Sequence, residues 1–252
     1  YGLGNGLTFP FYVGATAVLM AERPTPESVL ARLAEHEPTI YFGVPTLYSA
    51  ILADPDNDHT RSSPRLRACV SAGEALPEGV GRAWENRFGV PILDGLGSTE
   101  MLHIFLSNTA QAYRYGTSGK AVPGYELKLL DENGVVAASG DMGELWVRGP
   151  SSAVAYWNQR AKSVDTFQGP WTRTGDKYLV DAEGYYTYCG RTDDMLKVSG
   201  IWVSPFEVES ALIEHEAVLE AAVVGHKDEH GLVKPKSFIV LKEGVGATTA
   251  LE

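Results

Sequence analysis

The sequence has little cysteine, no long apolar run and no cluster of basic residues, and each shortage excludes a class of protein. Its 252 residues include two cysteines, Cys69 and Cys189. Two thiols are too few for a disulfide-stapled secreted domain and are typical of the reducing cytoplasm. No apolar run approaches the ~20 residues that span a bilayer, and Lys and Arg are dispersed along the chain. We therefore predict a cytoplasmic protein without a membrane partner.

The charge balance argues against a nucleic-acid partner. The formal net charge is −11, and nucleic-acid phosphates would repel such a surface. With 44% hydrophobic residues the chain can bury a sizeable core. Its first residues, YGLGNG, contain no initiator Met, basic segment or cleavage site, so we expect an internal piece of a longer chain and not a targeting signal. Nothing in the sequence indicates an oligomeric state.

Residues 1–110 alternate between helix and strand signals, which predicts a mostly parallel α/β layer. Thr25 followed by Pro26 is typical of a capped helix start, before the apolar positions Val29, Leu30 and Leu33. Further helices are predicted over 46–52 and 78–88, where Val80, Trp84 and Phe88 share one helical face. Strands are predicted over 39–42, 67–71 and 90–93.

The pattern changes twice further along the chain. Residues 111–190 show short alternating strands and tight turns, which predict an antiparallel, barrel-like part of the same large domain. Residues 191–252 hold a hinge and the start of a small α+β C-terminal domain. There Ser204 caps a helix with the apolar face Val208, Ala211 and Leu212, before strands over 219–224 and 237–241. The predicted fold class is therefore α/β: a partial large domain followed by an incomplete small one.

The segment DGLGSTE at residues 94–100 directly follows a predicted strand. Its two glycines would let the backbone approach a ligand, and Ser98 and Thr99 could donate to phosphate oxygens. Glu100 could hold Mg²⁺, a hard cation that prefers a carboxylate together with substrate phosphates. The alternative is a tight turn with a hydroxyl cap.

Two further polar segments are ambiguous when each is taken alone. In WTRTGD, residues 171–176, Asp176 could accept hydrogen bonds from a ribose diol, or it could simply cap a turn. In GRTDDMLKVSG, residues 190–200, Arg191 could contact ribose or phosphate. A polar, glycine-bounded link of this kind suits a hinge, and a surface loop is the alternative.

Taken together and in order, these segments resemble the nucleotide-binding and hinge motifs of the adenylate-forming superfamily. That superfamily includes acyl-CoA synthetases, luciferases and peptide-synthetase adenylation domains. Further matches cover essentially the whole chain: FGVPT at 42–46, SAGEAL at 71–76, GTSGKAVPG at 116–124 and GELWVRG at 143–149.

The resemblance implies a role for each matching residue. The ATP and AMP site would comprise Gly73, Glu74, Ala75, Asp94, Gly95, Leu96, Gly97, Ser98, Thr99, Asp176 and Arg191. Within it, residues 73–75 and 94–95 would flank the adenine, and Asp176 and Arg191 would contact the ribose. Thr99 would donate to the α-phosphate and Glu100 would bind Mg²⁺, which makes these two the catalytic residues.

Three other groups of residues carry the remaining implied roles. Asp193 would be the hinge about which the small domain turns, and Ser199 and Gly200 would approach coenzyme A. The run DGLGSTEMLHIF, residues 94–105, is most similar to benzoate-type CoA ligases. There Tyr1, Leu96 and His103 would line an aryl carboxylate pocket, since a flat ring favours apolar and aromatic walls. The alternative for His103 is a hydrogen-bonded structural histidine.

The implied function is an ATP-dependent acid–thiol ligase, which converts an aromatic carboxylate to an acyl-adenylate and then to a CoA thioester. Two alternatives use the same nucleotide residues: an adenylation domain that loads a carrier protein, and a non-catalytic nucleotide-binding module. The family's triphosphate loop and C-terminal lysine are not found here, so we expect the 252-residue chain alone to be inactive or weak. HKDEH at 226–230 resembles a zinc-peptidase pattern, but its flanking glycines predict a solvated loop.

Overall fold

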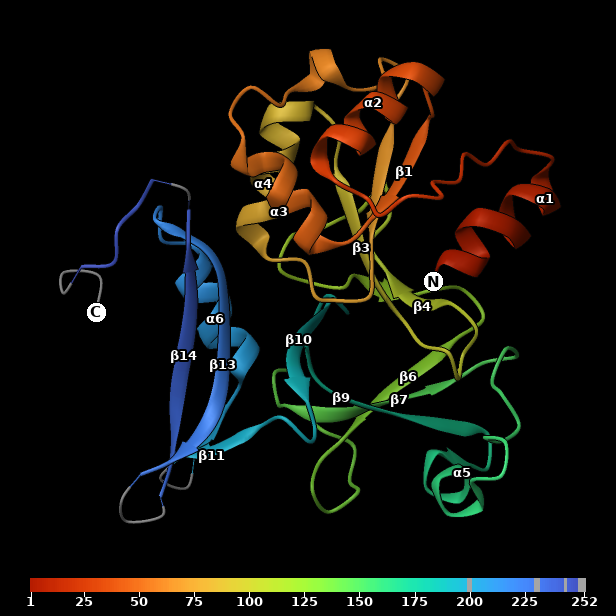
Figure 1. The fold of residues 1–252 in the computed structure, drawn as a ribbon. Helices are drawn as coiled ribbons and strands as arrows, with labels where there is room; N and C mark the ends of the chain where they lie inside the picture. Colours follow the sequence, from red (N-terminus) through yellow and green to blue (C-terminus); the bar gives the residue numbers. More distant parts are fainter. Residues whose placement is uncertain (199–200, 229–231, 243, 249–252) are drawn as a thin grey trace.

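The computed structural model describes residues 1–198, 201–228, 232–242 and 244–248. The chain forms an N-terminal α/β layer, a central antiparallel sheet and a C-terminal α+β unit, as Figure 1 shows from top to bottom and then to the left. The predicted mixed α/β fold class is therefore confirmed.

The first sheet has the strand order β1-β2-β3-β4-β5. Its strands are β1 (Ile40–Gly43), β2 (Ala68–Ser71), β3 (Ile92–Gly97), β4 (Ile104–Ser107) and β5 (Lys120–Ala121). The first three are parallel, as predicted, and β4 and β5 add an antiparallel edge. The prediction for β3 was too short, because this strand continues through the glycine-rich segment and pairs with β4.

Three helices connect and cover the parallel strands: α2 (Pro26–His36), α3 (Pro45–Ala53) and α4 (Glu78–Phe88). Thr25 caps α2, since its hydroxyl accepts from the backbone N–H of Ser28 at 3.2 Å. Short helical segments complete this part: η1 (Gly4–Thr8), α1 (Phe9–Val13) and η2 (His59–Arg61).

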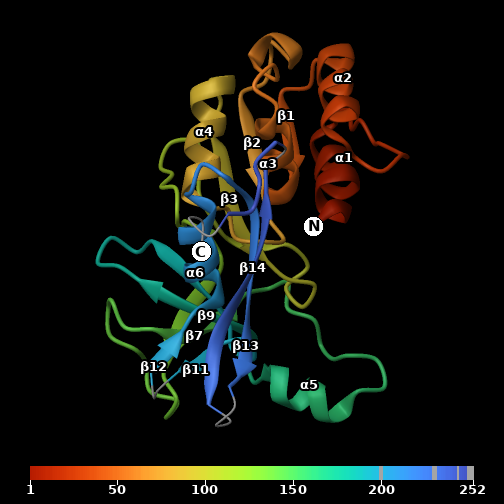
Figure 2. The same ribbon diagram turned by 60° about the vertical axis from the view of Figure 1, so that its left-hand side comes forward.

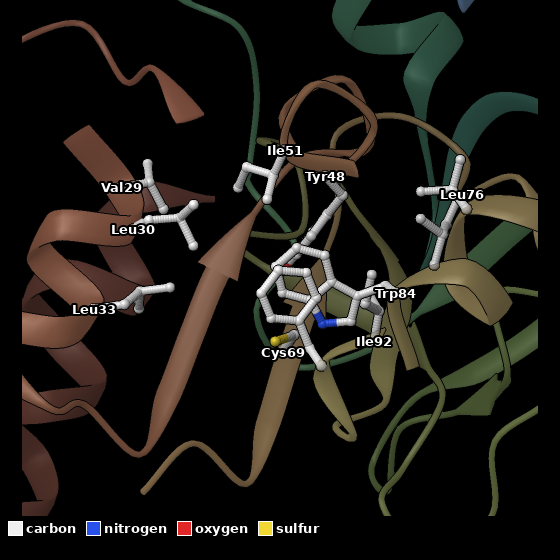
Figure 3. Packing of buried hydrophobic residues seen from close by; sticks show 11 residues of the cluster. Val29, Leu30, Leu33, Tyr48, Ile51, Cys69, Leu76, Trp84 and Ile92 are labelled. Carbon is white, nitrogen blue, oxygen red and sulfur yellow. The ribbon is translucent and has the colours of Figure 1, made fainter. Parts of the chain in front are cut away.

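The core of the α/β layer is centred on Trp84, whose side chain is fully buried (Figure 3). Its ring stacks on Phe88 with centroids 4.0 Å apart and meets Tyr48 edge-on at 4.8 Å. The predicted apolar faces of α2 and α4 both contribute to this cluster. The aromatic and aliphatic residues therefore bind α2, α3 and α4 to the sheet through burial of apolar surface.

The second sheet is antiparallel, with the order β10-β9-β7-β6. Its strands are β6 (Glu126–Leu130), β7 (Gly143–Arg148), β8 (Phe167–Gln168), β9 (Trp171–Val180) and β10 (Tyr186–Arg191), with β8 beside β9. Helix α5 (Arg160–Thr166) lies in the connection from β7 to β9. The sheet is open where a barrel was predicted, because β6 and β10 are edge strands in the described part of the chain. It has its own core, which includes Phe105, Leu145 and Tyr178.

The C-terminal unit comprises β11 (Leu196–Val198), β12 (Ile201–Val203), α6 (Pro205–Ile213), β13 (Val218–Lys227) and β14 (Val233–Leu241). The long β13–β14 pair stands in front of the other sheets in Figure 2. Ser204 caps α6 as predicted, accepting from the N–H of Glu207 at 3.1 Å. The predicted apolar face was wrong at Ala211, which is exposed, whereas Val208 and Leu212 are half-buried.

Specific side chains connect the C-terminal unit to the second sheet. Trp202 donates its indole N–H to Glu132 Oε1 at 2.8 Å, and the rings of Tyr188 and Phe206 lie 5.2 Å apart. The domain boundaries after residues 110 and 190 remain predictions, and β5, after the first of them, belongs to the first sheet.

Two smaller expectations concern the end of the chain and its helices. His226 lies in strand β13 and not in the loop predicted over residues 226–230. Residues 229–231 of that segment lie outside the described part. None of the helices in the described residues is long and apolar enough to cross a membrane.

Candidate functional site

A cleft of about 490 Å³ lies between the end of β3, strands β9 and β10, and helix α5. It brings together twelve predicted residues: Gly73, Glu74, Ala75, Asp94, Gly95, Leu96, Gly97, Ser98, Glu100, Asp176, Arg191 and Asp193. These residues come from four sequence segments, which include strands of two different sheets. The predicted nucleotide-binding segments therefore meet at one place.

Three of the predicted residues that the structure describes do not line this cleft. Thr99 is exposed and is not part of the lining, although its neighbours Ser98 and Glu100 are. Tyr1 and His103 belong to a separate aromatic group, and the predicted coenzyme A residues Ser199 and Gly200 lie outside the described residues.

Asp94 is a buried carboxyl group at the cleft end of β3, with 6% of its surface exposed. Ser118 donates to Asp94 Oδ2 at 3.3 Å and also contacts the Tyr178 hydroxyl at 3.2 Å. Asp94 Oδ1 is buried without a hydrogen-bond partner among the described residues. Burial raises the pKa of Asp94 well above its usual range, although the hydrogen bonds oppose this shift. The site therefore holds an acceptor that a ligand N–H could satisfy.

The turn after β3 explains the second glycine of the motif. A Cβ at Gly97 would lie 2.5 Å from the carbonyl oxygen of His103, so a side chain there would clash with the returning backbone. The Ser98 hydroxyl accepts from the N–H of Met101 at 3.2 Å, as a turn cap would. Glycine is thus required for the approach of β3 to its own turn, whatever the ligand.

Asp176 is positioned by a bulge in β9. Gly175 has a φ of +75° within the strand, and the register between β7 and β9 shifts at this place. The segment is therefore a bulged strand, and the alternative in which Asp176 caps a turn is wrong. Arg191 Nη1 donates to Asp176 Oδ1 at 2.9 Å. Burial raises the pKa of Asp176, and the charge of Arg191 opposes this shift.

Glu100 lies in the turn between β3 and β4, where Tyr156 donates its hydroxyl to Glu100 Oε1 at 2.5 Å. Burial alone would raise the pKa of Glu100, but the hydrogen bond from Tyr156 and the charge of Lys162 help to bring it below its usual value. The lowered pKa therefore favours the ionised form of Glu100 at this end of the cleft.

The carboxylates of the cleft suit Mg²⁺ better than a metal ion whose ligands all come from the protein. The described residues contain no group of three or more His, Cys, Asp or Glu that could enclose a metal ion. Mg²⁺ is commonly held by one or two carboxylates with water and substrate phosphates, and Glu100 supplies one such carboxylate.

Sequence reasoning missed several polar residues of the cleft. Arg173 pairs with Glu144 Oε1 at 2.7 Å and with Asp165 Oδ2 at 3.1 Å. The Lys162 ammonium lies 4.4 Å from the ring centroid of Tyr156. Glu144 belongs to the GELWVRG motif and could have been noticed, whereas Tyr156 and Lys162 stand in a segment that carried no recognised motif.

Tyr1 and His103 form part of an aromatic group beside β1. Their ring centroids are 6.0 Å apart, and Phe9 meets His103 edge-on at 4.5 Å. The Tyr1 hydroxyl donates to the carbonyl of Gly43 at 2.8 Å, and His103 Nε2 contacts Asn5 Oδ1 at 3.2 Å. Desolvation lowers the pKa of His103, which favours its neutral form. Both roles predicted for His103, a wall of the aryl pocket and a hydrogen-bonded structural residue, fit this environment.

A larger cavity of about 830 Å³ separates the α/β layer from the C-terminal unit. Its walls include Leu52 and Val80 on one side and Phe206 and Ile213 on the other. None of the predicted nucleotide residues lines it, so the smaller cleft is the candidate nucleotide site.

The mixed fold and this cleft define the class of the protein. Residues 1–157 match the family of AMP-binding enzymes, and residues 207–252 match the AMP-binding enzyme C-terminal domain. The chain belongs to the AMP-binding enzyme family.

Among its relatives are aryl-CoA ligases. The chain is 68% identical over 252 residues to a benzoate–CoA ligase of Thauera aromatica, covering 100% of this chain and 48% of the relative. It is 58% identical over 241 residues to a 4-hydroxybenzoate–CoA/benzoate–CoA ligase of Rhodopseudomonas palustris, covering 96% and 45%. The crystal structure of a benzoate CoA ligase from Burkholderia xenovorans LB400 superposes with a TM-score of 0.93 at 56% identity, covering 100% of this chain and 50% of that one. The chain thus spans about half the length of these relatives.

Proposed function

We propose that this chain is the nucleotide-binding part of an ATP-dependent CoA ligase that acts on benzoate or a hydroxybenzoate. The observation that carries the proposal is the cleft, where the adenine, ribose and magnesium segments predicted from the sequence meet. The benzoate–CoA ligase relatives support the choice of an aryl acid.

In this proposal, different residues of the cleft bind the adenine and the ribose of the nucleotide. Residues 73–75 and the end of β3 flank the adenine, and Asp94 Oδ1 offers a buried acceptor to an N–H group. Asp176 accepts from the ribose diol, and Arg191, which donates to it at 2.9 Å, orients its carboxyl group and opposes the rise of its pKa. The bulge at Gly175 points this pair into the cleft.

The phosphate end of the nucleotide lies toward Glu100. Glu100 would hold Mg²⁺, which supplies a positive charge that offsets the negative charge of the phosphates. Tyr156 fixes the Glu100 carboxylate through its hydroxyl. Thr99, exposed in the same turn, would reach the α-phosphate from the edge of the cleft.

The reaction has two displacement steps. A carboxylate oxygen of the aryl acid bonds to the α-phosphorus of ATP, and the bond to the bridging oxygen breaks, so that pyrophosphate leaves with the electron pair. The sulfur of coenzyme A, after losing its proton, then bonds to the acyl carbon and AMP leaves. Both steps depend on positioning and on charge stabilisation by groups already in place.

The remaining roles complete the proposal. Tyr1, Leu96 and His103 line the aryl pocket, and Tyr1 and His103 already lie together beside β1. Asp193, on the cleft wall, is the hinge, and Ser199 and Gly200 approach coenzyme A.

A second candidate is an aryl-acid adenylating enzyme that loads a carrier protein. The chain is 41% identical over 245 residues to the p-hydroxybenzoic acid–AMP ligase FadD22 of Mycobacterium tuberculosis, covering 97% of this chain and 34% of the relative. The same cleft would serve the adenylation step of either enzyme.

Calorimetry with AMP and with a non-hydrolysable benzoyl-adenylate analogue tests the nucleotide site of the 252-residue chain. We expect both to bind, and Asp176→Asn to weaken AMP binding roughly tenfold, since it replaces charge-assisted hydrogen bonds with neutral ones. Asp141→Asn, a change at an exposed aspartate away from the cleft, is the matched control. Failure of the chain to bind either ligand would contradict the proposal.

Activity separates the two candidates. A protein of the relatives' full length that contains this chain should form benzoyl-CoA from benzoate, ATP and coenzyme A. Transfer of the benzoyl group to a carrier protein but not to free coenzyme A would favour the second candidate.

A further inference from the structure

We propose that Lys162 binds the β- and γ-phosphates of ATP and thereby stabilises the pyrophosphate leaving group. The inference rests on the proposed function, because it assigns a new residue to the same nucleotide site. It follows from the charged side chains that line the cleft and from the ion pairs that most of its basic side chains already form.

Carboxyl groups outnumber basic groups along the cleft, so a polyanionic ligand needs cations to bind there. The basic side chains in the lining are Lys162, Arg173 and Arg191. Arg173 is occupied by ion pairs to Glu144 and Asp165, and Arg191 by its pair with Asp176. Within the described residues, Lys162 is the basic group of the lining that makes no direct ion pair.

The position of Lys162 matches the phosphate end of the nucleotide. It extends from helix α5, and its ammonium lies over the ring of Tyr156 at 4.4 Å from the centroid. The hydroxyl of the same tyrosine donates to Glu100, the proposed Mg²⁺ ligand. Lys162 and Glu100 therefore contact the same tyrosine, one at the face of its ring and the other at its hydroxyl. A phosphate chain that leads from the ribose to Glu100 would end near the ammonium.

The chemistry of an ammonium group suits this role. Lysine presents a compact charge with three donors, which can follow phosphate oxygens as they move. When the bond between the α-phosphorus and the bridging oxygen breaks, negative charge grows on pyrophosphate, and a nearby cation stabilises that charge. Lys162 is exposed and its ammonium lies over the ring of Tyr156, so it can reach the ligand without breaking an existing ion pair.

The test compares ligands that differ in their phosphates. Binding of ATP, AMP and inorganic pyrophosphate to the 252-residue chain is measured by calorimetry for the wild type, Lys162→Gln and Lys162→Arg. Lys128→Gln is the matched control, because Lys128 also lies over an aromatic ring, Trp171, at 4.2 Å but outside the cleft lining. Melting temperatures confirm that all four proteins are folded.

We expect Lys162→Gln to weaken ATP and pyrophosphate binding roughly three- to tenfold, as loss of a partly exposed charge contact would do. AMP binding should change less than about twofold, Lys162→Arg should keep most of the ATP affinity, and Lys128→Gln should match the wild type. The ATP effect should also shrink as salt is raised. A purely structural role for Lys162 would instead weaken AMP and ATP equally.

The outcomes separate this inference from the proposed function. If the wild type binds AMP but Lys162→Gln leaves the ATP to AMP affinity ratio unchanged, the assignment of Lys162 is overturned and the nucleotide site stands. If the wild type binds neither AMP nor ATP, the proposed function fails, and the assignment of Lys162 fails with it.

Discussion

Replacing Asp94 with asparagine should make the chain more stable at neutral pH, although Asp94 lies in the candidate site. The side chain is buried, its Oδ1 has no hydrogen-bond partner among the described residues, and burial raises its pKa. A neutral amide of the same shape removes the cost of burying the charge. Its NH₂ group can donate to Ser118, whose hydroxyl can in turn donate to Tyr178.

The dependence on pH follows from the raised pKa of Asp94. Below pH ~4 the carboxyl is protonated in both the folded and the unfolded chain, so it costs nothing. As pH rises, the unfolded chain releases the proton before the folded chain does, and the free energy of unfolding falls until the raised folded-state pKa is passed. The advantage of Asp94→Asn should therefore be small at pH 4 and grow toward pH 7. Asp176, whose pKa is also raised, titrates in both proteins and cancels in the comparison.

The expected gain at pH 7 is about 2 kcal/mol, because a buried carboxylate has a larger desolvation penalty than the neutral amide that replaces it. For a chain of this size that corresponds to a rise in melting temperature of roughly 4–8 °C. Urea unfolding of the wild type and Asp94→Asn between pH 4 and pH 8 measures the difference directly, with Asp141→Asn as the exposed control. Equal stability at pH 7, or a difference that does not vary with pH, would refute the reasoning.

Three further changes test the site and the core. Gly175→Ala should lower the free energy of unfolding by about 1–2 kcal/mol and weaken AMP binding, because the φ of Gly175 is +75° and the new Cβ would lie 2.9 Å from Arg191 Nη2. Urea unfolding would measure the stability and calorimetry the AMP affinity. If neither changes, the bulge is contradicted. Tyr156→Phe should raise the pKa of Glu100, which loses a hydrogen bond to its charged form, and an NMR titration of that carboxyl that shows no upward shift would disprove this. Trp84→Ala should cost about 3–5 kcal/mol of stability, since the ring is fully buried, and a loss below ~1 kcal/mol in urea unfolding would show that the core is loosely packed there.

Local patterns in the sequence were sufficient for α2, α3 and α4, but they did not predict the short segments η1, α1 and η2. In α4 the apolar residues Val80, Trp84 and Phe88 recur every four positions, and the helix ends at a glycine with a φ of +70°. Both signals act within one or two turns, so they do not depend on the rest of the chain. The same holds for the Thr25 and Ser204 caps, where one hydroxyl meets one nearby N–H.

The site depended on pairings that no local pattern carries. The glycines of β3 suggested a loop, but pairing with β4 keeps this segment a strand. Whether Gly175 forms a turn or a bulge is decided by the register of β9 against β7, from residues far away in the sequence. Tyr156 reaches Glu100 and carries Lys162 over its ring only because the segment around α5 folds back toward the turn after β3. The motifs predicted most of the residues that line the cleft, and tertiary contacts decided which further side chains join them.

The cleft joins two hydrophobic cores that otherwise bury separate sets of residues. One core holds Trp84 and belongs to the α/β layer, and the other holds Tyr178 and belongs to the antiparallel sheet. A nucleotide bound between Gly73 and Asp176, as proposed, would contact both halves at once, so its binding free energy would be lost when either half unfolds. The ligand would therefore act as a thermodynamic crosslink. It would make the two halves melt as one cooperative unit where, without ligand, each could open on its own.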